Sequence, residues 1–119
     1  MKEPSYCYQA EVSRVIDGDT IDAIIDLGFY IKITERLRLE GVDTPEIYGV
    51  PESSEEHKRG IEAKTYLEKR LAKNGNRMLV ETKKRGKRRR WLAKIYLPDS
   101  EISLNEELIE KGLAKRVSW

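Results

Sequence analysis

The sequence predicts an α+β protein in which five short strands form a barrel and two helices pack against it. Five separate segments have the apolar content of strands, and two of them, Thr20–Leu27 and Tyr30–Leu39, show the period-two alternation of half-buried strands. Two other segments combine a capping residue with the apolar spacing of a helix. The elements follow one another as three strands, a helix, two strands and a second helix.

The first three strands are predicted to form an antiparallel meander. Their ranges are Val12–Ile16, Thr20–Leu27 and Tyr30–Leu39. Asp17-Gly18 is a two-residue hairpin signal between the first two. Gly28 marks the next turn. Such short connections join strands that run in opposite directions and lie side by side.

A long helix is predicted after a loop rich in proline and glycine. Ser53 or Ser54 can cap its first turn, and the helix should run to about Lys73. Asn74-Gly75 is a typical helix end. The apolar residues between these limits fall on one stripe, which indicates a helix that packs against a core.

The second half of the chain adds two strands and a short helix. The strands are predicted at Arg77–Thr82 and Trp91–Leu97. Ser103 to Glu106 reads as a capping box, and Gly112 closes the helix that it starts. A helix between the third and fourth of five strands matches a Greek-key barrel of the OB-fold type. An SH3-like barrel or an open α+β sheet would contain the same elements.

Length and composition indicate one domain spanning residues 1–119. The single cysteine, Cys7, excludes an intrachain disulfide, and we expect a packed or idle thiol. His57, the only histidine, is expected at the surface rather than in catalysis. No apolar run reaches the roughly 18 residues of a membrane span. With no signal peptide visible, we expect a cytoplasmic monomer, or a secreted protein if a signal was removed.

Two acidic clusters suggest a metal site. The first is Asp17-Gly18-Asp19-Thr20, and the second is Asp43-Thr44-Pro45-Glu46; each follows a predicted strand. Clustered carboxylates repel one another unless a positive charge lies between them, and a hard divalent cation is a common solution. Either cluster taken alone could also be an ordinary turn.

Basic residues suggest that the substrate is a polyanion. Arg38 precedes the second cluster and could grip a phosphate with its two-pronged guanidinium, although Arg36 lies on the same strand face. Nine Lys or Arg and one acid occur between Arg77 and Lys94, although the net charge is only +2. The densest part consists of Lys83, Lys84, Arg85, Lys87, Arg88, Arg89 and Arg90. We expect this run to bind nucleic acid in a salt-sensitive way with little sequence preference; the alternative is a solvated loop.

Four segments resemble motifs of the staphylococcal nuclease (thermonuclease) family. They are VIDGDT at 15–20, RLEGVDTPE at 38–46, LAKIY at 92–96 and NEELIEKGLA at 105–114. The resemblance covers about residues 11–116 and includes both acidic clusters in the family's order. It implies an OB-fold barrel and calcium-dependent hydrolysis of phosphodiester bonds in DNA or RNA, which leaves a 5′-hydroxyl and a 3′-phosphate.

The resemblance also implies roles for the acidic residues. Asp19 and Asp43 would bind Ca²⁺ through their carboxylates and Thr44 through its carbonyl. Asp17 would support these ligands. Glu46 would act as the general base that activates the attacking water.

On the same resemblance, Arg38 and Arg90 would hold the phosphate and stabilise its transition state. The chain departs from the family where Arg88-Arg89 replaces Tyr-Gly, which leaves open whether Arg89 or Arg90 is the second arginine and removes a tyrosine from the nucleotide pocket. The chain also stops at Trp119, before a further helix that the family has. A non-catalytic OB-fold module that binds nucleic acid is therefore the alternative function.

Overall fold

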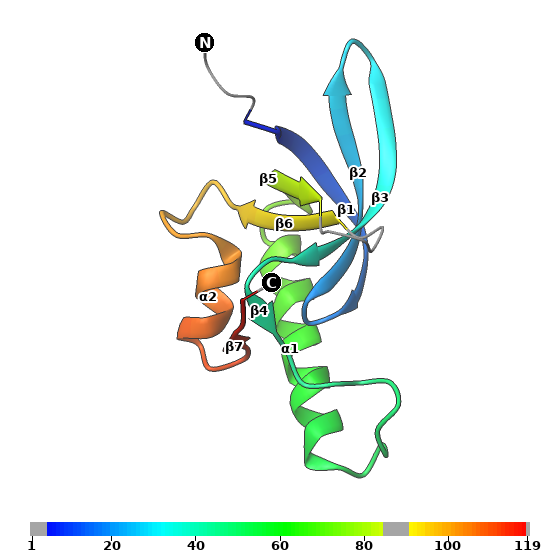
Figure 1. Ribbon diagram of the computed structural model, residues 1–119, viewed down its shortest axis with the longest axis vertical. Coiled ribbons are helices and arrows are strands. Elements are labelled where there is room, and N and C mark those ends of the chain that lie inside the picture. Colours follow the sequence, from blue (N-terminus) through cyan, green and yellow to red (C-terminus); the bar gives the residue numbers. More distant parts are fainter. Residues whose placement is uncertain (1–4, 85–90, 119) are drawn as a thin grey trace.

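A closed barrel of five strands forms the centre of the molecule (Figure 1). The computed structural model describes residues 5–84 and 91–118. Around the barrel, neighbouring strands follow the order β1-β2-β3-β6-β5. The barrel strands are β1 (Cys7–Asp17), β2 (Thr20–Gly28), β3 (Ile31–Leu39), β5 (Arg77–Lys84) and β6 (Trp91–Tyr96). All pairs are antiparallel except β3 and β6, whose parallel pairing closes the barrel. The predicted OB-type barrel is confirmed.

The β1–β2 hairpin turns at Gly18 and Asp19, between the paired residues Asp17 and Thr20. Gly18 is buried, and a Cβ atom added to it would lie 2.8 Å from the Cβ of Ala63 and 2.8 Å from Oγ1 of Thr44. Only glycine fits this close approach between three segments. The glycine therefore lets the turn that carries Asp19 press against the second acidic cluster.

The β2–β3 hairpin extends well beyond the barrel, and its tip is seen at the top of Figure 1. Phe29 and Tyr30 form the tip, with φ of 56° and 64° and with almost complete exposure. The third strand therefore starts at Ile31, one residue later than predicted. The left-handed backbone of the tip turns the chain in the sense that suits twisted hairpin strands.

The long helix α1 (Glu55–Ala72) confirms the predicted range and selects Ser54 as its cap. Oγ of Ser54 accepts a hydrogen bond from the backbone N–H of His57 at 3.2 Å. Gly75, with φ of 66°, follows the last turn, as predicted. The buried face of α1, which includes Leu67 and Leu71, packs against the barrel.

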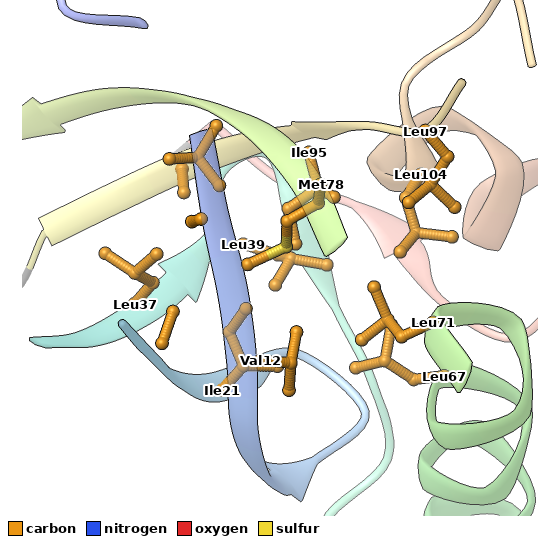
Figure 2. Close-up of a cluster of buried hydrophobic side chains, with 14 of the residues drawn as sticks. Val12, Ile21, Leu37, Leu39, Leu67, Leu71, Met78, Ile95, Leu97 and Leu104 are labelled. Atoms are coloured by element: carbon orange, nitrogen blue, oxygen red, sulfur yellow. The ribbon is translucent and has the colours of Figure 1, made fainter. Parts of the chain in front are cut away.

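The core lies inside the barrel and continues under both helices (Figure 2). Its largest fully buried side chains are Ile21, Leu37, Leu39, Leu67, Leu71, Ile95, Leu104, Leu108, Val42 and Val80. Apart from Val42, these are residues of the predicted strands and helices. Strand alternation in the sequence therefore identified the inside of the barrel.

The short helix α2 (Leu104–Glu110) begins at Ser103, whose Oγ accepts from the N–H of Glu106 at 3.1 Å. A capping box also requires the carboxylate of Glu106 to bond the backbone N–H of Ser103, and this part of the prediction is wrong. The carboxylate of Glu106 instead accepts two hydrogen bonds from Arg116, both at 2.8 Å. Arg116 of the C-terminal segment thus binds the carboxylate that would have completed the capping box.

A second, two-stranded sheet was missed by the sequence analysis. In it β4 (Val42–Asp43) pairs with β7 (Lys115–Arg116), which brings the C-terminal segment beside the second acidic cluster. Strands of two residues have no alternation to detect. Cys7 also differs from the expectation of a packed thiol: it is exposed at the start of β1. Among the described residues, no helix is long and apolar enough to cross a membrane.

Candidate active site

Asp19 is the buried centre of the candidate site. Its relative exposure is only 3%, because the β1–β2 turn is covered by the loop after β4. Oδ2 accepts from the backbone N–H of Thr44 at 3.1 Å, and Oδ1 accepts from the hydroxyl of Thr20 at 3.1 Å. The two acidic clusters, 25 residues apart at this contact, are therefore joined by a direct hydrogen bond.

Arg38 connects the two clusters electrostatically. Its Nη1 lies 2.8 Å from Oδ1 of Asp19, and its Nη2 lies 3.4 Å from Oδ1 of Asp43. Nη2 also donates to the carbonyl of Val42 at 3.1 Å. The Nε atom is buried with no hydrogen-bond partner among the described residues. A buried guanidinium with a spare donor is suited to accept an oxyanion.

Arg36, which the sequence could not distinguish from Arg38, lies apart from the two acidic clusters. Its Nε pairs with Oδ1 of Asp22 at 2.8 Å on the exposed surface of the sheet. The side chain of Arg36 is 59% exposed, whereas that of Arg38 is 12% exposed. The two arginines share a strand face, but the turn and the loop after β4 cover only Arg38.

Asp17 supports Asp19 from the first strand. Its Oδ1 accepts the backbone N–H of Asp19 at 3.0 Å, which fixes the turn. Burial, together with the neighbouring Asp17, raises the pKa of Asp19 from 3.8 to about 6, against the opposing effects of Arg38 and the Thr44 N–H. The fold thus keeps two carboxylates close together at a free-energy cost, which a cation nearby would remove.

The loop after β4 carries Glu46 across the N-terminal part of α1. A Cβ atom added to Gly60 would lie 2.7 Å from the carbonyl oxygen of Pro45 and 2.9 Å from that of Glu46. Nδ1 of His57 lies 2.9 Å from the carbonyl oxygen of Ile47, so this histidine is half-buried and holds the loop. Neither contact was predicted from the sequence, although a glycine inside a helical pattern is a signal of close packing.

A groove of about 480 Å³ opens beside these residues. It is lined by Asp43, Thr44, Pro45, Glu46, Glu55, Glu56, Arg59, Gly112, Leu113, Ala114 and Lys115. Four of these residues are acids and two are bases, so the wall carries a negative excess. An anionic substrate would need a positive charge to approach it.

Two further contacts, one at the groove and one behind it, were not predicted from the sequence. Nζ of Lys115 lies 4.0 Å from Oδ2 of Asp43, on the small sheet. Asn105, buried at the start of α2, donates from Nδ2 to the carbonyls of Glu40 and Ala93, at 2.8 and 3.0 Å, and accepts from the N–H of Ile95 at 3.0 Å. Asn105 therefore fixes the strand ends that lead into the site.

The donor atoms fit a hard divalent cation chemically. Asp19 and Asp43 offer carboxylate oxygens, and Pro45 restricts Thr44 to an extended backbone that can present its carbonyl. Arg38 contacts both carboxylates, so both lie within reach of a single positive charge. Among the described residues, no three or more His, Cys, Asp or Glu side chains converge as a metal site. A cation here would complete its shell with water and substrate oxygens.

Most of the predicted basic run lies outside the described residues. This holds for Arg85, Lys87, Arg88, Arg89 and Arg90, so the choice between Arg89 and Arg90 stays a prediction. Lys83 and Lys84 are described and are exposed at the end of β5.

A sequence model of a protein family described as "Staphylococcal nuclease homologue" matches residues 36–118, which include Arg38, the second acidic cluster and α2. The chain belongs to this family.

Two relatives of the chain are informative. It is 34% identical over 130 residues to an uncharacterized protein from Methanocaldococcus jannaschii, a match that covers 91% of this chain and 58% of the relative. It is 38% identical over 104 residues to the thermonuclease of Staphylococcus intermedius, with 87% and 56% covered. The chain thus spans less than two thirds of the length of these relatives.

Proposed function

We propose that this member of the staphylococcal nuclease family is a nuclease that hydrolyses phosphodiester bonds in DNA or RNA. The reaction depends on a divalent cation, which we propose to be Ca²⁺. The observation that carries the proposal is the position of Arg38 between Asp19 and Asp43, the second of which lines the acidic groove. A non-catalytic domain would have no need to bury an arginine with a spare donor beside paired carboxylates. The thermonuclease relative supports the same activity.

The cation would be held by the carboxylates of Asp19 and Asp43 and by the carbonyl of Thr44. When bound, it supplies positive charge that neutralises phosphate oxygens. The hydrogen bonds from Thr20 and from the Thr44 N–H orient Asp19, and Asp17 fixes the turn behind it. These contacts keep the ligand oxygens in place before the substrate arrives.

The remaining steps belong to side chains. Glu46 takes a proton from the water that attacks phosphorus, a contribution of typically 10²–10⁴-fold in rate. Arg38 holds a phosphate oxygen through donors that strengthen as negative charge develops. Arg90 supplies the second guanidinium, and cleavage leaves a 5′-hydroxyl and a 3′-phosphate. Lys83 and Lys84 contribute phosphate contacts along the strand.

Cleavage of single-stranded DNA and RNA tests the proposal directly. Each substrate is incubated with the protein in Ca²⁺, in Mg²⁺ and in excess chelator. We expect cleavage in Ca²⁺ and none in chelator. Glu46→Gln should lower kcat by about 10²–10⁴-fold with unchanged unfolding, because Glu46 is exposed. Glu52→Gln is the matched control, since it removes an exposed carboxylate from the same loop.

Three outcomes contradict the proposal. Cleavage that persists in chelator rules out the cation, and undiminished cleavage by Glu46→Gln rules out the general base. Binding of nucleic acid without cleavage under every condition would favour the non-catalytic OB-fold module.

A further inference from the structure

A second hollow, of about 540 Å³, lies at one open end of the barrel. We call it the barrel mouth. It is lined by Tyr6, Tyr8, Ile25, Leu27, Ile33, Glu35, Thr82, Lys83, Lys84 and Trp91. None of these residues belongs to the candidate active site.

Strand alternation shows that this hollow is the end of the barrel interior. In β2 the inward row passes from buried Ile25 to exposed Leu27, and in β6 it passes from buried Ala93 to Trp91. Leu27 and Trp91 are 38% and 36% exposed. The β2–β3 hairpin extends past the other barrel strands (Figure 1). The inner face of its projecting part is therefore not covered by strands from across the barrel. Mouths of β-barrels are common ligand sites.

The mouth is separate from the active site but close to it along β3. Glu35 lies on the inward row and Arg38 on the outward row of the same strand. Three residues of a strand span roughly 10 Å. Trp91 pairs with Leu37, beside the pairing of Arg38 with Leu92. One extended ligand can therefore reach both places.

The backbone of Tyr6, at the mouth, has an unusual conformation. Tyr6 has φ of 49°, a conformation that side chains other than glycine rarely adopt. Its carbonyl accepts from the N–H of Thr82 at 3.1 Å, which fixes this conformation. Tyr6 is nevertheless 57% exposed. The fold thus keeps an aromatic ring at the rim, where it lacks the cover of a core residue.

Charge favours an anionic occupant. Among the described residues that line the mouth, Lys83 and Lys84 are the bases and Glu35 is the one acid. Flat aromatic rings on an apolar floor, with lysines beside them, match a nucleobase attached to a phosphate. Glu35 adds an acceptor for the amino groups of a base. An aliphatic ligand would leave the lysines without a role.

We infer that the barrel mouth is a base-stacking subsite for single-stranded DNA or RNA, in which unpaired bases lie against Trp91, Tyr8 and Tyr6 and the backbone phosphates meet Lys83 and Lys84. The inference rests on the proposed nuclease function for its class of ligand. It adds that the substrate is bound as an open strand, since bases within a duplex have no free face.

Fluorescence of Trp91 tests the subsite. The sequence has two tryptophans, so Trp119→Phe leaves Trp91 as the sole reporter. In chelator, this protein is titrated with an oligothymidylate and with an abasic strand of equal length, which keeps the phosphates but lacks bases. The oligothymidylate should change Trp91 emission and bind at least about 5-fold more tightly than the abasic strand. A duplex of the same length should leave the emission unchanged.

Variants then separate stacking from charge. In anisotropy measurements with a labelled strand, Trp91→Ala should weaken oligothymidylate binding by roughly 5- to 100-fold. The affinity for oligothymidylate should then be close to the affinity for the abasic strand. Trp91→Phe should restore much of the difference. Tyr6→Ala, an exposed change that spares the core, should act in the same direction. Tyr96→Ala is the control, because Tyr96 lies on the opposite face of β6.

Equal affinity for the two strands, or Trp91 emission that ignores oligothymidylate, overturns the subsite. The subsite is also overturned if Trp91 emission changes with protein concentration alone while the measured mass doubles. Such a result would mean that the protein dimerises and that a second copy covers the mouth. The proposed function fails independently of this: a protein that never cleaves but distinguishes the two strands keeps the subsite, and one that cleaves without distinguishing them loses only the subsite.

Discussion

Nη1 of Arg38 lies 2.8 Å from Oδ1 of Asp19, and both side chains are almost completely buried. Arg36 lies two residues before Arg38 on β3, and Asp22 lies three residues after Asp19; these two side chains form a pair of the same length on the exposed surface. Both are Arg–Asp ion pairs, but one is buried and the other is exposed to solvent. Their comparison isolates the effect of burial, because a buried charge that loses its partner cannot be screened by water.

Arg38→Met should therefore destabilise the fold by about 3–5 kcal/mol. The double variant with Asp19→Asn should recover part of this loss, with a coupling energy of about 0.5–3 kcal/mol. Urea unfolding measures all four members of the cycle. Arg36→Met with Asp22→Asn is the matched control, and its coupling should be close to zero. Equal coupling in the two cycles would contradict the role given to burial.

Gly60→Ala should reverse the usual sign of a helical glycine substitution. Alanine ordinarily stabilises a helix interior by about 1 kcal/mol. Here the new Cβ would meet the carbonyl oxygens of Pro45 and Glu46, and overpacking of this kind costs about 1–3 kcal/mol. We expect lower stability in urea and a lower kcat, since the loop that carries Glu46 must move. Thr65→Ala, at an exposed position of the same helix, should be neutral or stabilising; a stabilised Gly60→Ala would show that the loop yields freely.

Because of Tyr66, we expect the free energy of unfolding to fall at alkaline pH. Its hydroxyl donates to Oε2 of Glu107 at 2.6 Å, and burial together with this carboxylate raises the pKa of Tyr66 from 10.0 to about 12. Because the folded state favours the protonated phenol, this contribution is complete below about pH 10 and disappears as the pH rises towards about 12. Urea unfolding across this range should show a steeper decline for the wild type than for Tyr66→Phe. Tyr96→Phe is the control, and a parallel decline in all three proteins would refute the role of Tyr66.

Lys83 and Lys84 should contribute to the salt dependence of binding. Each phosphate contact adds about 0.7 to the slope of log K against log salt for a single strand. Replacing both lysines by serine should therefore reduce the slope by up to about 1.4. The control replaces Lys69 and Lys111, which are exposed on α1 and just after α2. An unchanged slope for the Lys83 and Lys84 variant would mean that these lysines do not touch phosphates.

The sequence alone determined the barrel and much of the list of candidate residues. Alternation identified the inward rows of β2 and β3, and capping serines marked the starts of both helices, with Ser53 or Ser54 for the first and Ser103 for the second. These signals are local: a strand face, a turn or a cap is encoded within a few neighbouring residues. The resemblance to the nuclease motifs depended on equally short segments around Asp19 and Asp43.

Tertiary structure decided which of these residues act together. Arg36 and Arg38 are equivalent in the strand pattern, and only the covering of the β1–β2 turn by the loop after β4 distinguishes them. The sheet between β4 and β7, the packing of Gly60 against the loop of Glu46 and the aromatic mouth around Trp91 all join segments distant in sequence. Contacts of this kind depend on how the barrel closes, and no short stretch of sequence records them.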